Sequence, residues 1–302
     1  MPSLRQEAVA RLTRLYPFYS GRGTLANSSL VSAMAGRSSE LAWGRVRGGL
    51  LAPAPLDDYV GRAVYFMGEL DPKVSWVFRK LVSPGDSVLD IGANIGLTAM
   101  ILSSLVGPSG AVHAFEPNPK ARSLLERAIE KNRARNVVVH GVALGREEGS
   151  LDLFVPHGHA GKGSLVPNFA GVVAALGETM QVPVKTLDQL FAETQFDRLR
   201  LVKMDVEGFE AEVLRGARSF FDRCKPSALV FEIAMNNKPL GERESVRLLD
   251  EFGYDFLSIP KTLARMRVRP ASLREVPEGH DMVAVRRGAA AQQVVAALSR
   301  PW

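Results

Sequence analysis

Short apolar runs alternate with segments of helical periodicity through most of this chain. The runs have the length of buried strands, and they lie at residues 88–91, 111–115, 137–139, 199–204 and 228–233. Two further strands are predicted near 255–259 and 282–286, and a hairpin is predicted around 146–149. This alternation predicts an α/β fold with a doubly wound, mostly parallel sheet that binds its ligands at the carboxyl ends of the strands.

The segments before and after this alternating region are organised differently. Residues 1–55 are predicted to form an N-terminal extension that starts with an amphipathic helix over 4–15 and ends in a turn-rich stretch. A domain over 56–288 follows, in which a helix at 73–81 leads into the first strand. The tail at 289–302 is expected either to pack as a short apolar helix on a partner subunit or to fray.

Composition supports one α/β domain with extensions, because 302 residues with 46% hydrophobic content can bury a sizeable core. The single cysteine, Cys224, excludes an intrachain disulfide framework. No apolar run of about 18 residues predicts a membrane span. The N-terminus lacks the basic start and apolar core of a secretory signal, so a cytoplasmic location is expected.

A glycine-punctuated turn follows the first predicted strand. The strand ends in a carboxylate, Asp90, and the turn contains Gly92, Asn94 and Gly96 directly before a helical pattern. Glycines let a ligand approach the backbone, and the free N–H groups of the next helix attract a carboxylate or phosphate. Asn94 stands near where a dinucleotide fingerprint has its second glycine, so a smaller ligand is favoured. The alternative is an ordinary tight strand-to-helix turn.

The second predicted strand also ends in an acid, Glu116, 24 residues after Gly92. In nucleotide-binding α/β folds a carboxylate at this spacing accepts both ribose hydroxyls. Asn118 and Pro119 match the N-cap and first position of a helix over 120–132, so Asn118 is interpreted as a cap rather than a ligand contact. Two strand ends are therefore predicted to meet at one ligand.

Five motifs, taken in order, resemble the FkbM family of S-adenosylmethionine-dependent methyltransferases. They are DIGANIG at 90–96, AFEPNP at 114–119, ALG at 143–145, TLD at 186–188 and LVKMDVEGFEAEVLRG at 201–216. The resemblance spans roughly residues 56–260. It implies a Rossmann-like, seven-stranded class I methyltransferase fold whose last strand runs antiparallel. It also implies methyl transfer, commonly to oxygen, on acceptors that include sugars and natural products.

The resemblance implies a binding site for S-adenosylmethionine. The glycine turn would hold the methionine end of the cofactor, and Glu116 would hold its ribose. Asp90 would bind either the amides of the turn or, through water, the amino group of the ligand. Val142, after the third strand, would line the adenine pocket. The predicted cofactor residues are thus Asp90, Gly92, Asn94, Gly96, Glu116 and Val142.

Catalytic residues are expected at the end of the fourth strand. Asp205 should emerge near the sulfonium, where it would act as a base, orient the acceptor or anchor a divalent cation. Glu207 is either a second catalytic acid or a residue favoured by the dipole of the next helix, and the dipole reading is preferred for Glu210. Lys203 would pair with a neighbouring acid or meet an anionic acceptor.

Two weaker hypotheses concern a metal and the acceptor. Glu232 ends the adjacent strand, and with Asp205 and the amides at 236–237 it would suit Mg²⁺; alternatively it accepts backbone N–H groups or pairs with Lys203. The glycine-dense loop at 156–164 is predicted to bind the acceptor. Its histidines, His157 and His159, are interpreted as solvent-exposed rather than as metal ligands.

Tyr59 and Tyr65 precede the first strand, where family members cover the cofactor. They are expected to close over the site or, preferably, to pack inside the protein.

The net charge of +6 and the pI near 9.6 raise the question of a nucleic-acid acceptor. The basic residues are scattered, however, and the arginines at 265, 267 and 269 are typical of a charged edge strand. This pattern disfavours a nucleic-acid acceptor and is compatible with an acidic saccharide or a lipid-linked sugar.

Three functions compete. The leading one is an O-methyltransferase acting on a sugar, glycan or small molecule. The alternatives are a nicotinamide-dependent oxidoreductase, which Asn94 disfavours, and a non-catalytic S-adenosylmethionine-binding or assembly protein. The sequence predicts neither the acceptor nor the oligomeric state.

Overall fold

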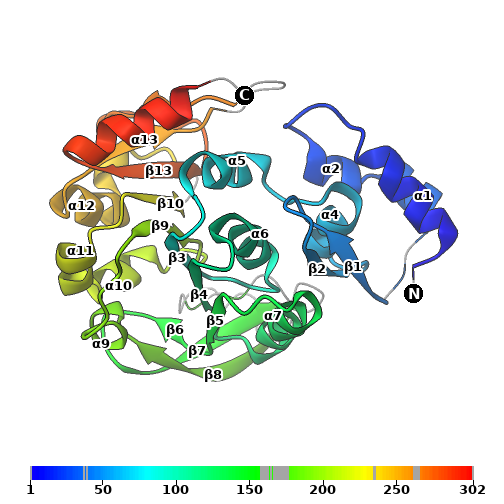
Figure 1. Cartoon of the computed structure of the whole chain (residues 1–302), viewed down its shortest axis with the longest axis horizontal. Coiled ribbons are helices and arrows are strands. Elements are labelled where there is room, and N and C mark those ends of the chain that lie inside the picture. Colours follow the sequence, from blue (N-terminus) through cyan, green and yellow to red (C-terminus); the bar gives the residue numbers. More distant parts are fainter. Residues whose placement is uncertain are drawn as a thin grey trace.

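The computed structural model describes residues 2–36, 38, 40–156, 163, 165, 177–233, 236–260 and 266–300. Its centre is a twisted eight-stranded sheet with helices on both faces (Figure 1). The strand order is β12-β11-β13-β10-β9-β3-β4-β5. The bounds are β3 (Ser87–Ile91), β4 (Ala111–Phe115), β5 (Val137–His140), β9 (Leu199–Met204), β10 (Ala228–Glu232), β11 (Tyr254–Ser258), β12 (Arg269–Pro270) and β13 (Asp281–Arg286).

The predicted sheet is confirmed. Strands β5, β4, β3, β9 and β10 run parallel, and β13 inserts antiparallel between β10 and β11. The eighth strand, β12, has two residues and forms the edge, and its Arg269 pairs with Glu275 at 2.9 Å. The winding reverses between β3 and β9, so this edge of the sheet has the crevice in which doubly wound folds bind ligands.

Strand alternation separates two cores. Val88 of β3 packs into one core, and Leu89 and Ile91 pack into the other. The helices of the first side are α4 (Tyr59–Met67), α5 (Pro72–Leu81), α6 (Leu97–Val106), α7 (Pro119–Asn132) and α13 (Ala289–Ser299). Those of the second are α9 (Leu187–Leu190), α10 (Glu210–Arg215), α11 (Arg218–Cys224) and α12 (Glu244–Glu251), with the short η1 (Leu240–Glu242) before α12.

A second sheet of three strands corrects the predicted hairpin. The turn at 145–148 joins β6 (Ala143–Leu144) to β7 (Gly149–Pro156), but these two strands do not pair with each other. Both pair with β8 (Gly177–Lys185), which lies between them, parallel to β6 and antiparallel to β7. The hairpin partner of β7 is therefore a strand that comes after the 156–164 loop, and a local turn signal could not identify it.

The C-terminal tail packs on its own chain. Val294 and Leu298 of α13 are buried, and the helix lies against α5 and β13. The predicted apolar helix is therefore present and packed rather than frayed, and its contact with a partner subunit stays a prediction. Among the described residues, no helix combines the length and apolar character that a bilayer crossing needs.

The N-terminal part contains α1 (Leu4–Thr13), α2 (Arg22–Ala26), α3 (Ser29–Ala35) and the hairpin of β1 (Leu41–Arg45) and β2 (Leu51–Pro55). One buried carboxylate joins this part to the rest of the molecule. Glu69 has 0% exposure and lies within 3.3 Å of Arg22, 3.1 Å of Arg47 and 3.6 Å of Arg79. We refer to these four residues as the Glu69 cluster.

Candidate active site

The glycine turn after β3 is shaped by close packing against its neighbours. Gly92, Asn94 and Gly96 all have positive φ, at 78°, 51° and 92°. A Cβ on Gly92 would lie 2.0 Å from the carbonyl oxygen of Asp205, and one on Gly96 would lie 2.7 Å from a methyl of Leu125. The absence of side chains on the two glycines therefore lets β9 and α7 pack closely against the turn. The sequence suggests a different reason for these glycines, namely access of a ligand to the backbone.

Glu116 connects the turn to the end of β4. Its Oε2 accepts a hydrogen bond from Asn94 N at 2.8 Å, and its Oε1 accepts one from Asn118 N at 2.8 Å. The side chain is 7% exposed, and burial raises its pKa to about 7 against the partial compensation of these two bonds. Asn118 also caps α7 through its side chain, which confirms its predicted role.

Asp90 lies beneath the turn and lines neither of the cavities described below. It is fully buried, accepts a hydrogen bond from Thr98 Oγ1 at 2.6 Å and lies 3.3 Å from the ammonium of Lys203. Asp90 and Lys203 are register partners on neighbouring strands, which places both side chains on the same face of the sheet. Of the two readings of Asp90, this position favours support of the turn over direct ligand contact.

Lys203 is a buried cation that holds the strand ends together. Its Nζ donates to the carbonyl of Gly92 at 2.7 Å and lies 3.8 Å from Asp205. Burial alone would lower the pKa of Lys203, but Asp90 and then Asp205 outweigh it, and the pKa is raised. Since an ammonium already lies beside Asp205, the Mg²⁺ hypothesis gains no support from this arrangement.

Asp205 and Glu207 follow β9 into the crevice. The backbone N–H of Asp205 continues the pairing with β3 by donating to Ile91 O at 3.1 Å, and its carboxylate is 38% exposed. Glu207 has φ 52° and Gly208 has φ 95°, so the chain turns sharply here. Glu210 is buried and accepts hydrogen bonds from Val206 N and Gly208 N, both at 3.3 Å. Its predicted structural role is confirmed.

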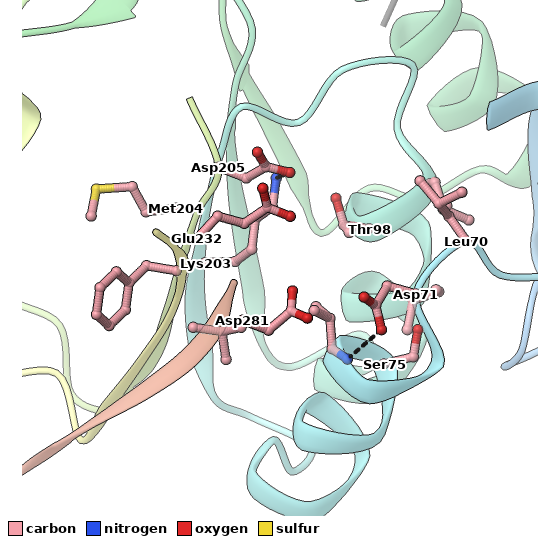
Figure 2. A pocket seen from close by; sticks show the side chains of 14 residues that line it. Leu70, Asp71, Ser75, Thr98, Lys203, Met204, Asp205, Glu232 and Asp281 are labelled. Atoms are coloured by element: carbon pink, nitrogen blue, oxygen red, sulfur yellow. Dashed lines mark hydrogen bonds and ion pairs between the residues drawn. The ribbon is translucent and has the colours of Figure 1, made fainter. Parts of the chain in front are cut away.

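Glu232 faces Asp205 across the strand ends (Figure 2). Burial raises its pKa to about 8, and the charges of Asp205 and Glu207 add to this effect. Glu232 pairs in register with Asp281, the first residue of the antiparallel β13. Lys73 forms an ion pair with Asp281 and lies 3.8 Å from Asp71. Carboxylates from three strands and from the start of α5 thus border one small cavity.

Two adjoining cavities occupy this edge of the sheet. The larger, of about 290 Å³, runs from the glycine turn past Glu116 to Asp205 and Glu207. The smaller, of about 100 Å³, continues toward the ends of β10 and β13 (Figure 2). Six residues line both: Leu70, Leu97, Thr98, Lys203, Asp205 and Glu232. The predicted convergence of the turn, Glu116 and Asp205 at one crevice is therefore present.

Some predicted residues lie elsewhere. Val142 packs against the second core and lines neither cavity. Tyr65 is 6% exposed and packed inside the protein, as preferred, whereas Tyr59 is 44% exposed and lines the larger cavity. His157 and His159 lie outside the described residues.

Several lining residues were not predicted. Leu153 and Leu165 reach the larger cavity from β7 and the segment after it, and Asp71 and Ser75 reach the smaller one from α5. The position of Asp281 at the start of a predicted strand could have identified it as a site residue. An antiparallel strand starts at the edge where its parallel neighbours end, so its first residue belongs to the site.

Comparisons with known proteins agree with the family that the sequence motifs resemble. A family profile described as the Methyltransferase FkbM domain matches residues 90–264. "Methyltransferase 1" of Beauveria bassiana is 33% identical over 148 residues, which are 44% of this chain and 59% of that protein. The 31-O-demethyl-FK506 methyltransferase FkbM of Streptomyces tacrolimicus is 28% identical over 158 residues, covering 44% and 60%. The hexuronic acid methyltransferase AglP of Haloferax volcanii is 31% identical over 132 residues, covering 43% and 49%. The chain thus spans about half to three fifths of these relatives.

Proposed function

The chain belongs to the FkbM methyltransferase family, and we propose that it transfers a methyl group from S-adenosylmethionine to a hydroxyl oxygen of a saccharide or other small molecule. The observation that carries the proposal is the convergence of the glycine turn, Glu116 and Asp205 on one cavity. The names of two relatives, a hexuronic acid methyltransferase and a demethyl-FK506 methyltransferase, support a hydroxyl-bearing acceptor.

The donor set of the larger cavity fits S-adenosylmethionine. Glu116 retains lone pairs for a diol besides its two backbone hydrogen bonds. Asp205 and Glu207, joined by Glu232 above its pKa of about 8, supply negative charge where a sulfonium would lie. The volume of about 290 Å³ is near the lower end of ligand pockets, which run from about 300 to 1,000 Å³. Val142 stays a proposed adenine contact, although it lines neither cavity.

In the proposed reaction, different residues of the chain would remove the proton of the acceptor and hold the strand ends in position. When bound, the cofactor supplies a methyl group on a positively charged sulfur. Asp205 and Glu232 lie where an acceptor hydroxyl would approach, and the ionised form of either can take its proton. Lys203 keeps Asp205 and the end of β9 in position through its bonds to Asp90 and Gly92. The chief contribution of the protein is alignment of the acceptor oxygen behind the methyl carbon.

The charges of the smaller cavity restrict the acceptor. Asp71, Asp205, Glu232 and Asp281 border it; Lys203 is the cation of its lining, and Lys73 pairs with Asp281 from outside the lining. Asp71 and Asp205, joined by Glu232 above its pKa of about 8, give the cavity its negative charge. Because like charges repel strongly in a partly buried site, we infer that the acceptor group entering it is neutral or amine-bearing. A hexuronate would have to place its carboxylate outside this cavity.

A ligand-binding experiment tests the cofactor assignment. S-adenosylmethionine and S-adenosylhomocysteine should raise the thermal midpoint of the wild-type chain, and NAD should not. Glu116→Gln should lose most of this shift, whereas Glu126→Gln on the exposed side of α7 should keep it. A shift produced by NAD alone would overturn the proposal in favour of an oxidoreductase.

A transfer experiment tests the chemistry. Labelled methyl donor should label a neutral or amino sugar more readily than a hexuronate, and Asp205→Asn should bind the donor but transfer on the order of 10²-fold more slowly. Binding of the donor without transfer to any fraction of a cell extract would instead favour a non-catalytic binding protein.

A further inference from the structure

The N-terminal helices present an apolar surface outside the active site. Leu4, Leu12 and Leu15 on and after α1 are 86%, 58% and 76% exposed. Leu30 and Met34, one turn apart on α3, are 62% and 36% exposed. Large apolar side chains that gather in this way are costly on a surface that only contacts water.

These side chains are not the core-facing residues of their helices. Val9, Ala10 and Thr13 bury the opposite side of α1 against the protein, so α1 is apolar on both sides. The helices α1 and α3 lie against each other, and Arg5 of α1 donates to Ala33 O of α3 at 2.9 Å. We call the outward surface of the two helices the α1–α3 face. In Figure 1, α1 lies at the outer edge of the molecule, away from the sheet.

The charge of the chain is concentrated in the same part. Residues 1–55 contain seven arginines and two glutamates, which is five of the six net positive charges of the whole chain. Arg5 and Arg11 are exposed on α1 beside the leucines, with Glu7 as the one acid of that helix. Arg22 and Arg47 of this part pair with buried Glu69, so the positive charge on the α1–α3 face comes from Arg5 and Arg11. The face therefore combines exposed leucines with exposed arginines.

We propose that the α1–α3 face binds peripherally to an anionic lipid bilayer. Leucines enter the acyl boundary and arginines meet lipid phosphates, which is how interfacial helices bind membranes. A second copy of the chain fits less well, because it would bring Arg5 and Arg11 of one copy against the same arginines of the other. Nucleic acid fits less well too, because its phosphates would contact the arginines but leave the leucines exposed to water. The proposal does not depend on the methyl-transfer chemistry.

Vesicle co-sedimentation of the 302-residue chain tests the proposal. The wild type should bind vesicles of phosphatidylcholine with about 30 mol% phosphatidylglycerol at least tenfold more strongly than phosphatidylcholine alone, and less strongly at high salt. The variant Leu4→Ser, Leu12→Ser, Leu15→Ser should bind about tenfold or more weakly. Its unfolding curve should stay close to that of the wild type, since the three side chains are exposed.

A matched variant controls for general loss of apolar surface. Leu151→Ser with Leu273→Ser alters leucines outside α1 and α3 that are 37% and 36% exposed, and it should bind vesicles like the wild type. Equal binding of the wild type and the triple variant, or no binding by either, would overturn the proposal. A dimer in light scattering that the triple variant dissociates would assign the face to a second copy instead, and nucleic-acid binding that survives in the triple variant without vesicle binding would also overturn it.

Discussion

Glu232 has the acid–base properties that a catalytic base needs near neutral pH. Burial and the charges of Asp205 and Glu207 raise its pKa to about 8, so it is protonated below this pH and ionised above it. Initial rates at subsaturating donor and acceptor, which report the free enzyme, should therefore rise with pH through an apparent pKa of about 8. Glu232→Gln should abolish this rise and lower the rate on the order of 10²-fold.

Two companion variants separate Glu232 from its neighbours. Asp205→Asn removes a charge that raises the pKa of Glu232, so the remaining activity should rise at lower pH than in the wild type. The exposed Glu242→Gln should leave the profile unchanged. A Glu232→Gln enzyme with the wild-type profile would show that another group takes the proton.

The buried carboxyl of Glu116 should make the unfolding free energy of the chain depend on pH. Its pKa in the folded ligand-free chain is about 7, above the usual 4.5 of a glutamate. The folded state therefore holds this proton to higher pH than the unfolded state does, and its stabilising contribution, present below pH 4.5, is lost as pH rises through 7. Between about pH 5 and pH 8 the wild type should lose roughly 2 kcal/mol of unfolding free energy that Glu116→Gln does not lose.

Urea denaturation of both chains across this pH range, without ligand, measures the difference. Parallel pH dependence of the two chains would mean that the pKa of Glu116 is the same in the folded and unfolded states. Glu126→Gln, exposed on the same region of chain, should follow the wild type.

At the level of elements, the turn between β3 and α6 depends on the absence of a side chain at Gly92. Gly92→Ala places a methyl 2.0 Å from Asp205 O in a backbone conformation with φ 78°, so β9 must move away. We expect a loss of about 2 kcal/mol or more in unfolding free energy and weaker binding of S-adenosylmethionine. Gly149→Ala, with open space around the added methyl and no positive φ, is the control in denaturation and titration calorimetry. Equal behaviour of the two variants would contradict the packing argument.

The elements were largely predictable, and their distant partners were not. Each long strand of the main sheet follows from a local apolar run, and the site residues Gly92, Glu116, Asp205 and Glu232 follow from strand ends. The pairing of β6 and β7 with β8 depends on a strand more than twenty residues further on. Leu153 and Asp71 likewise reach the cavities from elements that only tertiary packing brings there.

At the level of the whole molecule, the Glu69 cluster joins α2, the β1–β2 turn and α5 next to Leu70, which lines both cavities. Glu69→Gln leaves the arginines without their buried counter-charge, so about 3 kcal/mol or more of unfolding free energy should be lost. Arg22→Ala should cost more than Arg47→Ala, because the side chain of Arg22 is 7% exposed and that of Arg47 is 39% exposed. Denaturation of the three variants tests this order, and a negligible effect of Glu69→Gln would refute it.

The same cluster limits how the chain can be divided or recombined. A fragment that starts at residue 56 keeps Glu69 and Arg79 but loses Arg22 and Arg47, so a buried acid would face a single guanidinium. A chimera that grafts these N-terminal helices onto a relative would need the acid and both arginines transplanted as one set. Residue 55 is thus the last residue before the main domain in the order of elements, but truncating the chain there would separate the residues of one buried charge cluster.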